Sequence, residues 1–120
     1  MDDEPAMEEK RRFGRYPISS LGRIFLEGDP RGMQISVENI GRGGAGLLAR
    51  SAVGGNQAAR LQFPYFDVVG NVRVGTVDGR VVWTAVGQEG ARMGLAFHHE
   101  IGPDTDPPLC DLLERLEGRT

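Results

Sequence analysis

The sequence predicts a mainly β protein, a small antiparallel barrel of six or seven strands followed by one C-terminal α-helix. Strand signals are short and alternate between apolar and polar residues, and only one segment, near the end, has the leucine spacing of a helix. Glycine is frequent, at 18 of 120 residues, which suits tight turns and bulges better than long helices. A chain of this length forms one hydrophobic core, so a single domain is expected.

Seven segments carry the strand signal. In the second of them Met33, Ile35 and Val37 alternate with polar residues, the pattern of a half-buried strand. Turns are expected at residues 28–32 and 87–90, where glycine gathers with proline or polar residues. The expected strands are Ser20–Glu27, Met33–Asn39, Gly46–Ala49, Ala58–Phe63, Val72–Val77, Gly79–Val86 and Arg92–His98.

The segment from residue 72 to residue 86 has two interpretations, which is why the strand number is six or seven. Residues 77–80 are compatible with a hairpin turn between two strands. They are equally compatible with one long bent strand that has a bulge at Gly75 or Gly79.

The last element is the clearest helix. Asp106 is a good N-cap, Pro107 suits the first helical position, and Gly118 ends the helix. A helix of little more than ten residues is marginal alone, so its apolar face must pack on the barrel of the same chain, which we favour, or on a partner subunit. That face consists of Leu109, Leu112, Leu113 and Leu116.

Two short stretches together indicate a phosphate site. The first is the basic run at residues 10–15, whose guanidinium groups can bind phosphate oxygens or a guanine edge through paired hydrogen bonds. The second is the glycine-rich stretch at residues 39–46, where backbone N–H groups can approach an anion closely beside an asparagine that both donates and accepts.

In this order and at this separation, the two stretches resemble the PilZ family of bacterial cyclic di-GMP receptors, whose pattern is R-x-x-x-R, often R-R-x-x-R, followed by [D/N]-x-S-x-x-G. One position departs from it, because Gly41 stands where the family usually has a serine that helps bind the ligand. Residues 80–83 and 94–97 resemble the late strand pair of the family, so the resemblance covers nearly the whole chain. The candidate ligand-binding residues are Arg11, Arg12, Arg15, Asn39, Gly41 and Gly44.

The resemblance implies a six-stranded barrel with a C-terminal helix that binds cyclic di-GMP, without a further cofactor, and signals through an unidentified protein partner. It implies that the arginines clamp phosphates and guanines, that Asn39 reads a guanine edge and that Gly44 permits close approach. The segment Glu9–Pro17 is expected to precede the first strand and to fold over the ligand. Trp83 and Phe97 are expected in the barrel core rather than as base-stacking platforms.

Charge and composition limit where the protein can act and what else it can bind. Residues 1–9 form an acidic tail that is expected to be disordered, and residues 10–118 form the single PilZ-like domain. With a net charge of −3, no apolar run long enough for a membrane span and an acidic start unlike a secretory leader, we expect a cytoplasmic monomer or weak homodimer with no membrane insertion. The lone Cys110 and two adjacent histidines give no zinc pattern, so no metal site is expected.

Three alternatives stay open at this point. A degenerate PilZ domain could act as a protein-interaction adaptor without nucleotide binding. A small barrel could bind single-stranded nucleic acid, but the 8 aromatic residues (5 Phe, 2 Tyr, 1 Trp) and the negative net charge disfavour a nucleic acid polymer as partner. An enzyme is disfavoured, because no nucleophile with a base, metal triad or paired-carboxylate motif is found.

Overall fold

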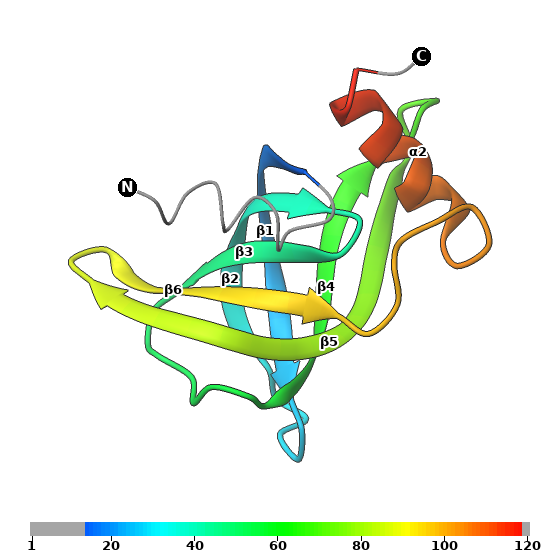
Figure 1. Ribbon diagram of the computed structural model, residues 1–120. Coiled ribbons are helices and arrows are strands. Elements are labelled where there is room, and N and C mark those ends of the chain that lie inside the picture. Colours follow the sequence, from blue (N-terminus) through cyan, green and yellow to red (C-terminus); the bar gives the residue numbers. More distant parts are fainter. Residues whose placement is uncertain (1–13, 119–120) are drawn as a thin grey trace, which may run out of the picture.

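The structure is a computed structural model that describes residues 14–118 of the chain. Within these residues, six antiparallel strands form a closed barrel and a single helix follows them (Figure 1). The elements are β1 (Arg15–Leu26), β2 (Met33–Gly41), β3 (Gly44–Ala49), β4 (Ala58–Phe66), β5 (Val72–Gly87), β6 (Gly90–Phe97) and α2 (Pro107–Leu116). The predicted fold class is confirmed.

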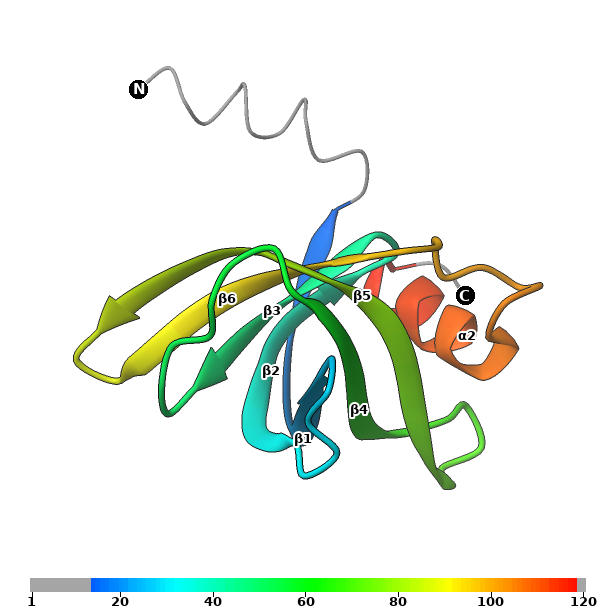
Figure 2. The same cartoon turned by 90° about the horizontal axis from the view of Figure 1, so that it is seen from below.

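The strands follow the order β1-β2-β3-β6-β5-β4 around the barrel. The first three strands form a meander, β6 pairs with β3, and β4 pairs with β1 to close the ring. Two hairpins extend from the barrel on opposite sides, β4–β5 next to α2 and β5–β6 away from it (Figures 1 and 2).

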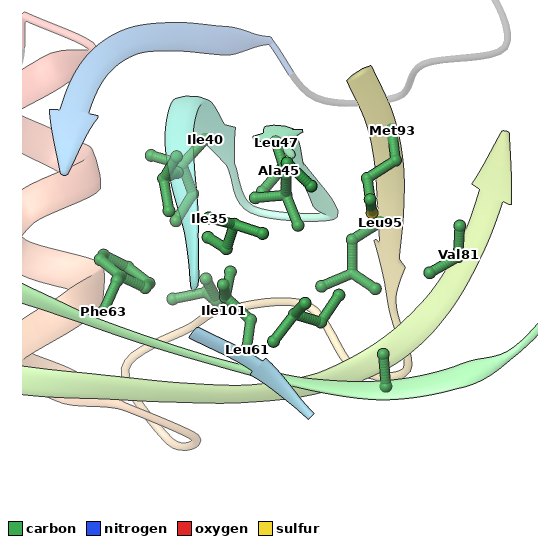
Figure 3. Close-up of a cluster of buried hydrophobic side chains, with 14 of the residues drawn as sticks. Ile35, Ile40, Ala45, Leu47, Leu61, Phe63, Val81, Met93, Leu95 and Ile101 are labelled. Atoms are coloured by element: carbon green, nitrogen blue, oxygen red, sulfur yellow. The ribbon is translucent and has the colours of Figure 1, made fainter. Parts of the chain in front are cut away.

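The interior is a single apolar cluster to which every strand contributes (Figure 3). Side chains alternate between this core and the outer face along β2 and β4, as the expected strand pattern requires. Leu109 and Leu113 of α2 are fully buried in the same cluster, and Asp106 caps the helix by accepting a hydrogen bond from the Leu109 N–H. The helix therefore packs on the barrel of its own chain.

Residues 72–87 form one long strand rather than a hairpin. Its first half pairs with β4 and its second half pairs with β6, and Gly79 pairs with both neighbours. A continuous strand keeps the backbone hydrogen bonds of both ladders, which a turn at residues 77–80 would break. The predicted position of the bulge, at Gly75 or Gly79, is wrong, because the register shifts between Val81 and Trp83.

The first strand begins earlier than predicted, at Arg15 instead of Ser20. Arg15 pairs with Gly41 and Pro17 pairs with Asn39 in the β1–β2 ladder. Because β4 pairs with β1 only from Arg23 onwards, this first part of β1 has one neighbour, and a proline without an N–H is tolerated there. The expected segment that precedes the first strand is therefore wrong for residues 15–17, and its residues 9–13 lie outside the described part of the chain.

Candidate functional site

Four of the six predicted site residues, Arg15, Asn39, Gly41 and Gly44, lie at one end of the β1–β2–β3 meander. The Arg15 Nη1 donates to the Asn39 Oδ1 at 3.4 Å. A Cβ atom on Gly44 would lie 2.8 Å from the Arg15 Nη2, so the guanidinium lies across this glycine and uses the space that its missing side chain leaves. Gly41 is the register partner of Arg15 at the start of β1. Arg11 and Arg12 lie outside the described residues.

The strand register explains this arrangement. In an antiparallel meander the start of β1, the end of β2 and the start of β3 share one end of the sheet. Only Arg42 and Gly43 separate β2 from β3. The described glycines with positive φ do not include Gly41, Gly43 or Gly44, so the backbone angles of this turn do not require glycine.

Gly41 is required by a close contact between strands. A Cβ atom at this position would collide with the backbone carbonyl oxygen of Gly14. Gly14 immediately precedes β1, in which Arg15 is the register partner of Gly41. The place that a serine side chain would need is therefore occupied by the backbone leading into β1.

Gly41→Ser is expected to destabilise the protein by about 1–2 kcal/mol, because backbone atoms must move to accept the side chain. The shift would displace Arg15 and weaken any ligand contact that it makes. Thermal melting checks this result against Gly55→Ser, at a glycine where a Cβ atom meets nothing within 4 Å. An unchanged melting temperature together with tighter cyclic di-GMP binding would instead mean that the serine restores a missing contact.

A row of paired residues continues the site across the outer face of the barrel. Asn39 pairs with Gly46, Gly46 pairs with Gly94, and Gly94 pairs with Trp83. A Cβ atom on Gly46 would lie 2.5 Å from the Asn39 Nδ2, and one on Gly94 would overlap the Trp83 indole. The Asn39 amide therefore lies over Gly46 and the Trp83 indole lies over Gly94, each in the space left by the missing side chain.

The sequence-based prediction that Trp83 lies in the core is wrong, and its position makes it a further candidate site residue. Its side chain is 46% exposed on the outer face, whereas Phe97 packs against the core as expected. Regular alternation would place Val81 and Trp83 on the same side of the strand, but the bulge between them turns Trp83 outward while Val81 stays fully buried. The signal in the sequence that could have indicated an outward-facing tryptophan was the pair of glycines, Gly46 and Gly94, on the two neighbouring strands.

Arg42 lies in the glycine-rich stretch but points toward the helix instead of the site. Its Nε and Nη2 donate to the two carboxylate oxygens of Glu117 at 3.1 and 3.2 Å, and its Nη1 donates to the carbonyl oxygen of Ile101 at 3.3 Å. The hydrogen bonds to Glu117 raise the pKa of the Arg42 guanidinium above its ordinary value. Arg42 therefore links the β2–β3 turn to Glu117, the residue that follows α2.

Comparison with known proteins identifies the family. The model of the PilZ domain matches residues 9–116. The chain belongs to the PilZ domain family. No curated protein matches this PilZ domain in sequence.

Two solved structures share the fold of the PilZ domain. The inhibitor of motility MotI/DgrA of Bacillus subtilis superposes with a TM-score of 0.66 at 15% identity, over 92% of this chain and 53% of that one. The PilZ domain of YcgR from Escherichia coli, solved with c-di-GMP, superposes with a TM-score of 0.63 at 15% identity, over 91% and 92%. The chain thus spans about half the length of the Bacillus protein.

Membership of the family sets the broad class of function. PilZ domains are binding and adaptor domains rather than enzymes. Among residues 14–118, no helix is both long enough and apolar enough to cross a membrane.

Proposed function

We propose that this PilZ domain is a stand-alone cytoplasmic receptor for cyclic di-GMP that changes conformation on binding and signals through a protein partner. The observation that carries the proposal is the juxtaposition of the Arg15 guanidinium with Asn39 and Gly44. It supplies a permanent cation, an amide that donates and accepts, and a position without a side chain at one end of the sheet.

The arrangement suits the chemistry of the ligand. Cyclic di-GMP carries two phosphates and two guanines in a compact ring. The planar guanidinium of Arg15 can bind a phosphate or the edge of a guanine through two parallel hydrogen bonds. Arg11 and Arg12 supply the remaining cations in this proposal, and Asn39 reads a guanine edge.

Trp83 extends the proposed site to base stacking. Gly46 and Gly94 lie on neighbouring strands about 5 Å apart, so the Asn39 amide and the Trp83 indole are within reach of one purine. A guanine stacked on the exposed indole could hydrogen-bond to the asparagine at the same time.

A second candidate function is a PilZ adaptor that docks on a partner without nucleotide. The observation that favours it is Gly41, because the Gly14 carbonyl occupies the space of the usual serine hydroxyl. Calorimetric titration of the purified protein with cyclic di-GMP separates the two functions. Saturable heat with micromolar or better affinity, and none with GMP, supports the receptor, and the absence of heat at high protein concentration supports the adaptor.

Trp83→Ala is expected to weaken cyclic di-GMP binding by about 1–2 kcal/mol, because base stacking on an aromatic side chain contributes this much. Trp83→Phe should retain part of the affinity. Because Trp83 is the single tryptophan of the chain, stacking should also quench the intrinsic fluorescence of the wild type. Val86→Ala, an exposed position on the same strand, is the control. If Trp83→Ala bound cyclic di-GMP with wild-type affinity, the binding site would include Arg15 and its neighbours but not Trp83.

A further inference from the structure

An ion pair between Glu38 and Arg92 crosses the outer face of the barrel beside the proposed site. The Arg92 Nε and Nη2 donate to the two carboxylate oxygens of Glu38 at 3.0 and 3.4 Å. Glu38 belongs to β2 and Arg92 to β6, so the pair passes over β3, which lies between these strands (Figure 1). Arg92 is two residues before Gly94, over which the Trp83 indole lies. The ion pair therefore borders the place proposed for a guanine.

A bulge in β2 brings Glu38 to the same face of the sheet as Asn39. Consecutive residues of a regular strand point to opposite faces. The β2–β3 register shifts between Val37 and Asn39, and Glu38 is the extra residue. Val37 and Ile40, on either side of the two polar residues, stay fully buried. Glu38 and Asn39 therefore both lie on the outer face, where neighbouring side chains can act on one ligand.

The outer face of β3 sets the order of the groups around the site. Its outward positions are Gly44, Gly46 and Leu48, which follow each other at about 7 Å, the spacing of alternate residues in a strand. The Arg15 guanidinium lies across the first position, the asparagine amide lies over the second, and Arg92 is the register partner of the third. A nucleotide with its phosphate at the first position therefore directs its base toward the carboxylate beside the third.

The charge at this end of the row suits a base better than a phosphate. Arg92 also pairs with Glu89 at 2.9 Å, so two carboxylates surround one guanidinium and leave a net negative charge, which repels a phosphate. A carboxylate has about four lone-pair positions, and the Glu38 carboxylate uses two of them for Arg92. The Glu38 side chain is 33% exposed. It is therefore accessible and able to accept a hydrogen bond from a ligand.

An asparagine alone does not distinguish guanine from adenine. Its amide has one donor group and one acceptor, a combination that pairs with N6–H and N7 of adenine as well as with an edge of guanine. The Watson–Crick edge of guanine presents the acceptor O6 and two neighbouring donors, N1–H and the 2-amino group. An amide satisfies only one of these donors, so the other needs an acceptor next to the amide. Adenine instead presents the lone pair of N1, which a carboxylate repels.

We propose that Glu38, held in place by Arg92, determines the specificity of the site for guanine by accepting a hydrogen bond from the 2-amino group. The inference rests on the proposed cyclic di-GMP receptor and deepens it by naming the residue that selects the base. The Asn39 amide donates to O6 and accepts from N1–H of the same guanine, while Trp83 supplies the stacking surface.

Calorimetric titration with cyclic di-GMP and cyclic di-IMP tests the assignment, because the second ligand differs only in lacking the two 2-amino groups. The wild type should bind cyclic di-GMP about tenfold or more tightly than cyclic di-IMP, since a carboxylate loses its hydrogen-bond donor in the second complex. Glu38→Ala should bind the two ligands with nearly equal affinity. The matched control is Glu89→Ala, which removes the same charge from the same arginine but in the β5–β6 turn, and should keep the wild-type ratio.

Cyclic di-AMP gives a second readout that a damaged fold cannot imitate. Glu38→Ala should bind this ligand about tenfold or more tightly than Glu89→Ala does, because only the first variant removes the repulsion of the adenine N1. Both variants should melt close to the wild type, since exposed ion pairs contribute little to stability.

The binding of cyclic di-GMP to the wild type tests the receptor, and the ratios between ligands test Glu38. A Glu38→Ala variant that keeps the wild-type ratio of cyclic di-GMP to cyclic di-IMP affinity, or that gains no affinity for cyclic di-AMP, would overturn the role of Glu38 and leave the receptor intact. A wild type that does not bind cyclic di-GMP would overturn both proposals.

Discussion

Arg42→Ala is expected to lower the free energy of unfolding by about 3 kcal/mol, because it breaks a largely buried ion pair between a guanidinium and a carboxylate. The Arg42 and Glu117 side chains are only 16% and 12% exposed. The substitution removes both hydrogen bonds to the Glu117 carboxylate and the one to the Ile101 carbonyl oxygen, in surroundings where water replaces them poorly. Urea denaturation followed by circular dichroism measures the loss.

The control for this prediction is an ion pair of the same geometry in water. Arg60 binds both carboxylate oxygens of Asp78, but these side chains are 56% and 52% exposed. Arg60→Ala should change stability much less, since exposed ion pairs contribute little. Equal losses in the two variants would mean that burial does not strengthen the Arg42 contact and that the turn is held to the helix by packing alone.

Arg15→Ala is expected to weaken cyclic di-GMP binding by about 1.5–3 kcal/mol, or roughly 10- to 150-fold, because it removes hydrogen bonds from a permanent cation to a charged ligand. The melting temperature of the free protein should change little, since Arg15 lies outside the apolar cluster. Calorimetric titration at two salt concentrations measures the effect, and added salt should weaken wild-type binding in the same direction.

Arg23→Ala is the matched control for the ligand effect. Arg23 lies on the same strand, β1, but its guanidinium donates to the carbonyl oxygens of Arg31 and Gly32 at the other end. Its removal changes the net charge equally without touching the proposed site. If Arg15→Ala and Arg23→Ala have the same affinity as the wild type, Arg15 does not contact the nucleotide.

The sequence predicted the features that depend on local pattern. The alternation of apolar and polar residues located the strands, and the Asp106 cap and the leucine spacing located the helix. The two motifs predicted that Arg15, Asn39 and Gly44 lie close together, and they do. These features follow from strand and helix periodicity and from the short β2–β3 connection. The assignment of all six candidate residues as ligand contacts, Arg11 and Arg12 included, remains a prediction.

The features that were missed depend on contacts between strands distant in sequence. A one-residue bulge between Val81 and Trp83 reverses the side of the tryptophan, and nothing in the local pattern marks its position. The need for glycine at position 41 comes from the carbonyl oxygen of Gly14, which only the β1–β2 register brings near. The role of Arg42 likewise depends on a residue beyond the helix.

The strand order has a consequence for how the site assembles during folding. Arg15, Asn39 and Gly44 all belong to the β1–β2–β3 meander, whose contacts are local in sequence and close early. Trp83 reaches them only when β6 has paired with both β3 and β5. A partly folded chain would thus possess the cationic half of the site before the aromatic half, and could attract phosphate groups before it could distinguish one base from another.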